Sequence, residues 1–157
     1  MNGAGAVEIC HHLADADATA AAAADLAART RPGDVFCLRG DLGAGKTTFA
    51  RGFLRALGVG EEIPSPTFNL LLTYETHLGT VWHFDLYRIT VPEEVIELGV
   101  EDAFADGICL IEWPDRLGSW QPQQRVDIHL ADADDGAART VRLQAFGGND
   151  DRWRDLW

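Results

Sequence analysis

Eight consecutive residues, Gly40–Thr47, constrain the fold of this chain more than any other segment. They read Gly-Asp-Leu-Gly-Ala-Gly-Lys-Thr and match the pattern G-x-x-x-x-G-K-[ST] without exception. The run Val35–Leu38 ends just before the match and is continuously apolar, as in strands buried on both faces. A helix is predicted over Thr47–Leu57, ended by Gly58. Strand, glycine-rich loop and helix in this order are typical of a loop that binds phosphate groups.

The residue types in this loop suit phosphate oxygens. Glycines let backbone N–H groups turn inward, because they tolerate positive φ and carry no side chain. The following helix adds unpaired N–H groups and the positive end of its dipole. Lys46, the only lysine of the chain, is expected to reach the β- and γ-phosphates, Thr47 to ligate Mg²⁺ and Thr48 to lie on the α-phosphate side. The alternative is an ordinary glycine-rich turn with a surface lysine, which the lack of any other lysine disfavours.

A magnesium nucleotide site also needs an acid, and the sequence offers two. Glu112 follows the apolar run Ile108–Ile111, so we expect it at the carboxyl end of a buried strand, where nucleotide sites form. Asp85 lies in another expected strand, in which His83, Asp85 and Tyr87 share one face. The alternatives are a solvated strand-end carboxylate for Glu112 and a salt bridge to a nearby arginine for Asp85.

The loop that contains Ser65-Pro66-Thr67-Phe68 is a third feature. It lies between the helix after the phosphate loop and the next expected strand. In nucleotide switches, a hydroxyl in this chain position meets the γ-phosphate and Mg²⁺ only when a triphosphate is bound. Thr67 is therefore a candidate, although a Ser-Pro turn explains the segment equally well.

The remaining pattern predicts a single α/β domain over residues 1–157. We expect a three-layer sandwich typical of P-loop NTPases, with a mostly parallel central sheet, antiparallel additions and helices on both faces. Residues 1–14 are expected to form a short N-terminal extension and residues 150–157 a C-terminal tail, and either end can be flexible. The helical spacing of Trp153, Leu156 and Trp157 favours a terminal helix docked on its own domain, and the alternative is an interface segment. The predicted helices cover residues 15–30, 47–57 and 92–98, and the predicted strands cover residues 35–38, 69–75, 80–88, 108–111, 125–130 and 139–146.

Charge and hydropathy limit the setting. The chain has 25 acidic and 13 basic residues, a net charge of −12, which argues against it gripping a nucleic-acid backbone by itself. No apolar run approaches the roughly 18 residues of a membrane span. The first residues carry neither the basic start nor the apolar core of a secretory signal, so we expect a cytoplasmic protein.

Taken together, the motifs resemble those of the TsaE family, also called YjeE, over about Asp15–Leu130. The matching segments are GDLGAGKTTFARGFLRALG at Gly40–Gly58, SPTF at Ser65–Phe68, HFDLYR at His83–Arg88, ELG at Glu97–Gly99 and IEWP at Ile111–Pro114. The resemblance implies a bacterial P-loop ATPase with weak intrinsic activity. It also implies a role in forming N6-threonylcarbamoyladenosine in tRNAs that read codons beginning with A, together with TsaB and TsaD homologues that would hold most of the tRNA.

Carried over position by position, the resemblance implies ATP and Mg²⁺ as ligands. Thr47 and Glu112 would hold the metal, and Asp85 and Thr67 would lie in its shell or position water. Either Asp85 or Glu112 would orient the attacking water. The residues implied to contact the ATP phosphates are Gly43, Ala44, Gly45, Lys46, Thr47 and Thr48. The segment Asp15–Thr19 would lie towards the adenine, Arg139 is a weaker candidate for the nucleotide edge, and Trp113 would report on binding.

Three other functions fit a phosphate loop. A small-molecule kinase usually closes an arginine-rich lid over the phosphates, and the acidic segment Ala131–Ala138 is a poor lid. A GTP switch needs a second lysine in its guanine-reading motif, which this chain lacks. A non-catalytic module that binds a partner in an ATP-dependent manner needs no turnover at all. No arginine finger can be named from the sequence, so the isolated chain is expected to hydrolyse ATP slowly.

Overall fold

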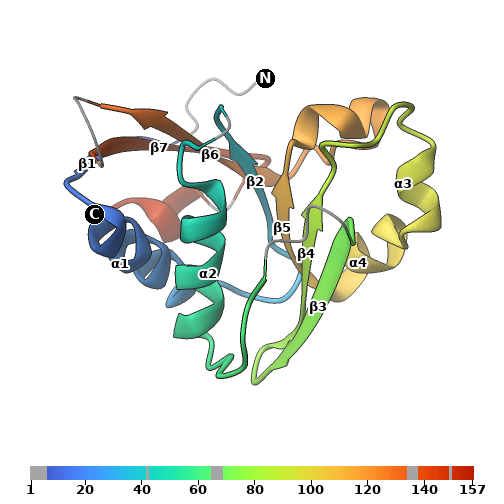
Figure 1. Cartoon of the computed structure of the whole chain (residues 1–157), viewed down its shortest axis with the longest axis horizontal. Coiled ribbons are helices and arrows are strands. Elements are labelled where there is room, and N and C mark those ends of the chain that lie inside the picture. Colours follow the sequence, from blue (N-terminus) through green and yellow to red (C-terminus); the bar gives the residue numbers. More distant parts are fainter. Residues whose placement is uncertain (1–6, 42, 65–68, 134–137, 149) are drawn as a thin grey trace.

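The structure is a computed structural model that describes residues 7–41, 43–64, 69–133, 138–148 and 150–157. Within these ranges, seven strands form one sheet in the order β1-β7-β6-β2-β5-β4-β3 (Figure 1). The strands are β1 (Glu8–Leu13), β2 (Val35–Arg39), β3 (Leu71–Thr76), β4 (Gly79–Asp85), β5 (Ile108–Glu112), β6 (Arg125–Asp132) and β7 (Arg139–Phe146). The helices are α1 (Ala16–Ala27), α2 (Lys46–Ala56), α3 (Glu94–Glu97) and α4 (Val100–Asp106), with 3-10 helices η1 (Pro114–Trp120) and η2 (Asp150–Trp153).

The centre of the sheet is parallel and its margins are antiparallel. Strands β6, β2, β5 and β4 are parallel neighbours, whereas β1–β7, β7–β6 and β3–β4 are antiparallel pairs. The predicted α/β sheet with antiparallel additions is therefore confirmed, with parallel pairing confined to the four central strands. Because β2, β5 and β4 are adjacent and parallel, their carboxyl ends meet at one edge of the sheet.

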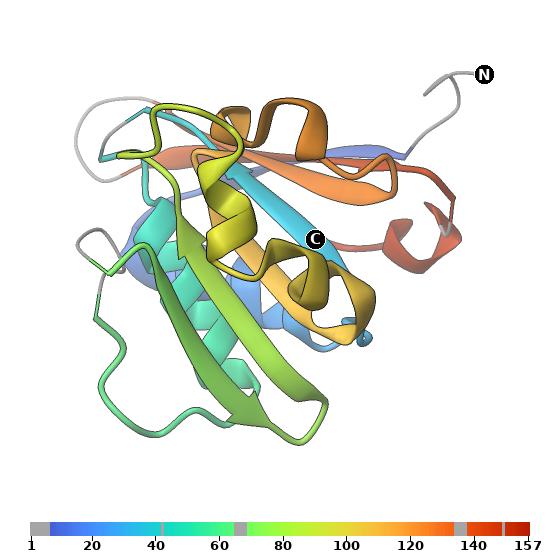
Figure 2. The ribbon, with the colours of Figure 1, turned by 90° about the vertical axis from the view of Figure 1, so that its right-hand side faces the viewer.

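Helices cover both faces of the sheet (Figures 1 and 2). On one face, α1 and α2 bury their apolar residues against alternate strand residues such as Phe36, Leu38 and Leu110. On the other face, α3, α4 and η1 pack against the intervening residues, including Cys37 and Ile111. The strictly alternating burial of β2 and β5 on two faces explains why both strands are apolar throughout.

A capping residue sets the start of α1, and small residues allow α1 and α2 to pack closely. Asp15 lies at the N-cap of α1, and its carboxylate accepts a hydrogen bond of 2.8 Å from the Ala18 amide. Helix α2 approaches α1 closely at Gly52, where a Cβ atom would lie only 2.7 Å from the Ala20 Cα. Small residues at this crossing let α2 lie close to α1, and this packing supports the helix that carries the phosphate loop at its N-terminus.

Most predicted elements are confirmed, with shifted ends. The hairpin β3–β4 forms as expected, but β4 ends at Asp85, short of residue 88. Helix α3 begins at Glu94, so the expectation of Pro92 at the first helical position is wrong by two residues. Strand β1 pairs with β7 inside segment 1–14, and α4 and η1 form where no element was predicted.

The segment 150–157 begins with η2 and docks on the first helical layer. Trp153 and Leu156 are buried in the cluster under α1 and α2, and Trp157 packs against that cluster. In the part of the chain that the structure describes, no helix has the length and apolar character needed to span a bilayer.

Candidate functional site

The turn between β2 and α2 is held open towards the carboxyl edge of the sheet. Gly40, Gly43 and Gly45 all adopt positive φ, at 147°, 81° and 103°. A Cβ atom on Gly40 would overlap the Leu130 carbonyl oxygen, so no other residue fits there. Gly45 is the N-cap of α2 and offers no side-chain cap, which leaves the first N–H groups of the helix available for an anion.

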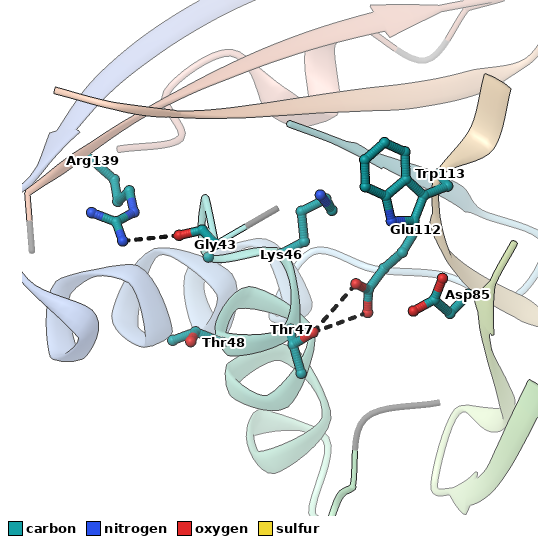
Figure 3. A pocket seen from close by; sticks show the side chains of 9 residues that line it. Gly43, Lys46, Thr47, Thr48, Asp85, Glu112, Trp113 and Arg139 are labelled. Carbon is teal, nitrogen blue, oxygen red and sulfur yellow. Dashed lines mark hydrogen bonds between the residues drawn. The ribbon is translucent and has the colours of Figure 1, made fainter. Parts of the chain in front are cut away.

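A pocket of about 250 Å³ opens in front of this turn (Figure 3). Residues from the loop, α2, β4, β5 and β7 line it. They are Gly43, Gly45, Lys46, Thr47, Thr48, Asp85, Glu112, Trp113 and Arg139. The structure therefore brings together the predicted loop residues, both predicted acids and the tryptophan beside Glu112. Ala44, also predicted to contact phosphate, is buried in the loop itself and does not line the pocket.

Lys46 is enclosed by its own loop. Its Nζ donates hydrogen bonds to the carbonyl oxygens of Gly40 at 2.5 Å and Asp41 at 3.0 Å, and it lies 4.2 Å from the centre of the Trp113 ring. Only 5% of the residue is exposed. Burial lowers the pKa of the ammonium group, and the carboxylates of Glu112, Asp85 and Asp41 oppose that shift.

Glu112 is a buried carboxylate at the end of β5. The Thr47 hydroxyl donates to it, with Oγ1 lying 3.3 Å from Oε1 and 3.5 Å from Oε2 (Figure 3). On its other side, Glu112 Oε2 lies 2.7 Å from His83 Nε2, and the histidine side chain is wholly buried. Sequence reasoning placed His83 on the face of Asp85 but assigned it no role; its partner follows only from the pairing of β4 with β5.

Asp85 ends β4 directly opposite Glu112 in the β4–β5 register. Its Oδ1 accepts a hydrogen bond of 3.0 Å from the Tyr87 amide, which anchors the carboxylate at the strand end. Figure 3 shows the Asp85 and Glu112 side chains entering the pocket from neighbouring strands, with Thr47 on the side of α2. The expectation that Glu112 lies at the carboxyl end of a buried strand is confirmed, because β5 ends at Glu112 and all five of its residues are buried.

Thr47 and Glu112 have the chemistry of a partial magnesium site. A hydroxyl and a carboxylate are hard oxygen donors of the kind that Mg²⁺ prefers, and Mg²⁺ usually binds few protein ligands together with phosphate oxygens and water. Within the described ranges, no group of three or more His, Cys, Asp and Glu side chains forms a self-sufficient metal site. The residues present therefore fit a metal that arrives with a phosphate ligand.

Arg139 braces the phosphate loop from the far side of the pocket. Its Nη2 donates to the Gly43 carbonyl at 3.0 Å (Figure 3). Its Nε donates to the Ala44 carbonyl at 3.1 Å. Asp132 lies 3.3 Å from the same Nε. The resemblance implied a place at the nucleotide edge for Arg139; the structure places it in the pocket lining with its guanidinium on loop carbonyls.

Asp15–Thr19, implied to lie towards the adenine, is not among the described residues that line the pocket. This segment begins α1, where the Asp15 carboxylate caps the helix. Thr67, with the rest of Ser65–Phe68, lies outside the described residues.

Comparisons with known proteins agree with these motifs. The family model described as "Threonylcarbamoyl adenosine biosynthesis protein TsaE" matches residues 13–141. A Rickettsia bellii protein named "tRNA threonylcarbamoyladenosine biosynthesis protein TsaE" is 43% identical over 110 residues, which are 69% of this chain and 76% of that protein. A Bacillus subtilis protein of the same name is 40% identical over 122 residues, 77% of this chain and 75% of the relative.

A solved structure shares the fold. The crystal structure of YdiB from Bacillus subtilis superposes with a TM-score of 0.82 at 31% sequence identity, and the match covers 96% of this chain and 95% of that one. The family match over most of the chain, the relatives at about 40% identity and this structural likeness all agree with the motifs from which the pocket is built. The chain belongs to the TsaE family.

Proposed function

We propose that this chain binds ATP with Mg²⁺, hydrolyses it slowly, and acts with TsaB and TsaD homologues to form N6-threonylcarbamoyladenosine in tRNA. The names of the relatives support the pathway. One observation carries the ATP site: Lys46, Thr47 and Glu112 converge at the open N-terminus of α2.

The loop would bind the triphosphate through charge and backbone donors. The N–H groups at the start of α2 and the Lys46 ammonium group supply positive potential in a pocket that excludes much of the solvent. The β- and γ-phosphates would replace the Gly40 and Asp41 carbonyls as partners of Lys46 Nζ. That exchange gives the buried ammonium group an anionic partner, which a charged donor favours over a neutral carbonyl.

Thr47 and Glu112 would hold magnesium, which neutralises charge on the phosphate oxygens when it is bound. Glu112 already accepts a hydrogen bond from Thr47 and lies within hydrogen-bond distance of His83 Nε2. Asp85 contributes a carboxylate that is anchored by the Tyr87 amide at the same edge of the pocket. We therefore assign the orientation of the attacking water to Asp85 and the metal contact to Glu112.

We expect the isolated chain to hydrolyse ATP slowly, because few cationic side chains can stabilise the transferring phosphoryl group. Arg139 is the arginine that lines the pocket in the described part of the chain, and its guanidinium is engaged with two loop carbonyls. Stabilising the transferring phosphoryl group would then depend on Lys46 and the loop amides until a partner completes the site. The net charge of −12 fits a division of labour in which partners bind most of the tRNA, in the cytoplasm.

The decisive experiment is tRNA modification reconstituted with the TsaB–TsaD pair under multiple-turnover conditions. We expect Lys46→Ala to lose repeated turnover and to bind ATP about 10- to 150-fold more weakly, the range for losing a charged hydrogen bond. Arg142→Ala is a matched control that removes a positive charge from β7 outside the pocket. ATP affinity is measured by calorimetry alongside the modification assay.

Each contrary outcome points to a different function. Unchanged ATP affinity in Lys46→Ala refutes the phosphate role of the loop. Normal ATP binding without turnover, even with both partners present, favours a non-catalytic module that binds partners. A phosphorylated metabolite in a substrate screen favours a small-molecule kinase.

A further inference from the structure

A buried histidine stands behind the acid of the candidate site. His83 lies in β4 with its side chain wholly inaccessible to solvent, and its Nε2 is 2.7 Å from Glu112 Oε2. This contact continues the chain of hydrogen bonds that begins at the Thr47 hydroxyl. The three side chains therefore run in series from the phosphate loop into the sheet.

Strand register produces this alignment. In the parallel β4–β5 pair, His83 lies opposite Leu110 and Asp85 lies opposite Glu112. Residues two apart in a strand share a face, so His83 and Glu112 are diagonal neighbours on the α2 side of the sheet. Asp85 and Thr47 are among the described residues that line the pocket, whereas His83 is not.

The contacts of the two ring nitrogens of His83 favour the tautomer that carries the proton on Nε2. His83 Nδ1 is buried and has no hydrogen-bond partner among the described residues. With the proton on Nε2, the ring donates to the carboxylate and only a lone pair on Nδ1 is left unpaired. A proton on Nδ1 would instead leave a buried N–H unsatisfied and would face the carboxylate with a second acceptor, which is the costlier arrangement.

We propose that His83 is a positioning residue that holds the Glu112 carboxylate in the orientation that binds magnesium. The proposal rests on the metal role assigned to Glu112 above. A donor fixed on Oε2 restrains rotation of the carboxylate and keeps Oε1 facing Thr47. Hydrogen-bond partners of metal ligands commonly change metal affinity by about 10- to 100-fold when they are removed.

A pair of substitutions separates positioning from simple packing. In His83→Gln the amide nitrogen can occupy the place of Nε2, whereas in His83→Asn it is one methylene too short to reach Glu112. Both variants replace the ring with a smaller polar side chain, so a packing role predicts similar behaviour for the two. His129→Gln is the control, because this half-buried histidine on β6 contacts Gln144 and does not line the nucleotide pocket.

The measurement is a calorimetric titration of ATP at a series of Mg²⁺ concentrations, with a further titration in excess chelator. We expect His83→Asn to need about 10- to 100-fold more Mg²⁺ to reach half of the metal-dependent gain in affinity. His83→Gln and His129→Gln should stay close to the unmodified chain, and binding of metal-free ATP should be alike in all four proteins. Equal behaviour of the Asn and Gln variants, whether both weakened or both normal, overturns the proposal.

A spectroscopic measurement on the unmodified chain covers the case in which His83→Asn fails to fold. With ¹⁵N-labelled histidine, we expect His83 to show a protonated Nε2 and a bare Nδ1, and to shift on adding magnesium-ADP but not metal-free ADP. The opposite tautomer, or no response to the metal, overturns the proposal. An unmodified chain that binds no ATP would instead contradict the proposed function itself, so the two failures are distinguishable.

Discussion

At the scale of single residues, the candidate site places a cation where folding alone would not favour one. Lys46 is almost completely buried, and among the described residues its ammonium group contacts two neutral carbonyls and the face of Trp113. Burial outweighs the surrounding carboxylates and lowers the pKa of the ammonium group. The folded chain therefore binds this proton less tightly than the unfolded chain does. The charge on Lys46 thus lowers the free energy of unfolding, and we attribute its presence to ligand binding.

This imbalance has a pH signature. The unfolded chain keeps the Lys46 proton up to about pH 10.5, whereas the folded chain releases it at lower pH. Because the unfolded state binds the Lys46 proton more tightly in that interval, Lys46 contributes a rise in the free energy of unfolding with pH, by up to about 1.4 kcal/mol per pH unit separating the two pKa values. The buried thiols of Cys37 and Cys109, whose pKa values burial raises, contribute a fall in every variant. The free energy of unfolding of the unmodified chain relative to Lys46→Met should therefore rise with pH, as measured by urea denaturation of both proteins at several alkaline pH values.

The control for that experiment is Arg142→Met, which removes a positive charge whose side chain is 40% exposed on β7. Its free energy of unfolding relative to the unmodified chain should not change with pH over this alkaline interval. Parallel stability curves for the unmodified chain and Lys46→Met would show that the lysine is not strained by burial.

The positions of some site residues could be predicted from the sequence, whereas the contacts of others could not. Lys46 and Thr47 belong to a contiguous motif whose local backbone determines their position, and Glu112 follows a strand whose burial is evident from composition. The contact between His83 and Glu112 depends on the register of two strands, and that of Arg139 with Gly43 joins residues 96 positions apart. Such contacts are set by tertiary pairing, which leaves no local pattern.

At the scale of elements, β7 acts on the loop between β2 and α2. Arg139, the first residue of β7, bridges the Gly43 and Ala44 carbonyls with two nitrogens of one guanidinium group. In a trans peptide the C=O and the N–H that follows it lie in one plane and point in opposite directions, so holding the carbonyl fixes the direction of that N–H. The arginine thereby fixes the orientation of two peptide planes in the loop that would bind phosphate.

We expect Arg139→Ala to weaken ATP binding by about tenfold, the lower end for losing charged hydrogen bonds. Arg139→Lys should be nearly as weak, because a single ammonium group cannot reproduce the planar pair of donors. Calorimetry gives both values, with Arg142→Ala as the control from the same strand. Full recovery by Arg139→Lys would show that only the charge matters.

The elements were predictable where their pattern is local. The strand Ile108–Glu112 and the helix after the loop follow from apolar runs and glycine signals. Helix α4 is only seven residues long, which is too short for a clear periodicity. In β1, the exposed residues Cys10, His11 and His12 break the alternation of apolar and polar residues, so this edge strand could not be recognised from its sequence. The order of the seven strands depends on pairings between distant segments and could not be read from any one of them.

At the scale of the whole molecule, the chain closes on itself at the end of the sheet opposite the pocket. Trp153 is buried against Phe36, with ring centres 5.9 Å apart, and Arg152 pairs with Asp34 through contacts of 2.6 and 2.9 Å. Trp157 donates to the Ala22 carbonyl. The three C-terminal residues that make these contacts lie outside residues 13–141, the part that matches the family model, and none of them lines the nucleotide pocket.

That separation predicts a variant with low stability and an intact site. Trp153→Ala should lower the free energy of unfolding by about 3–5 kcal/mol, the usual cost of truncating a buried tryptophan. ATP affinity should be unchanged at temperatures where the variant is folded. Trp153 packs near the start of β2, whereas the phosphate loop follows the end of that strand. Thermal unfolding and calorimetry test both points.

Trp120→Ala is the matched control, since this tryptophan is 36% exposed and its truncation should lower the free energy of unfolding by much less than that of Trp153. A loss of ATP affinity in Trp153→Ala at low temperature would show that the two ends of the sheet are coupled.

The enclosed lysine also makes the molecule unusually simple to probe. Because Lys46 is the only lysine in the sequence, an acylating reagent selective for primary amines has two targets here, the terminal amine and the phosphate loop. The terminal amine serves as an internal reference for reagent strength. The rate at which Lys46 gains the mass of the acyl group then measures how often the loop exposes its amine to solvent. The experiment needs no engineered label, because no other lysine side chain reacts.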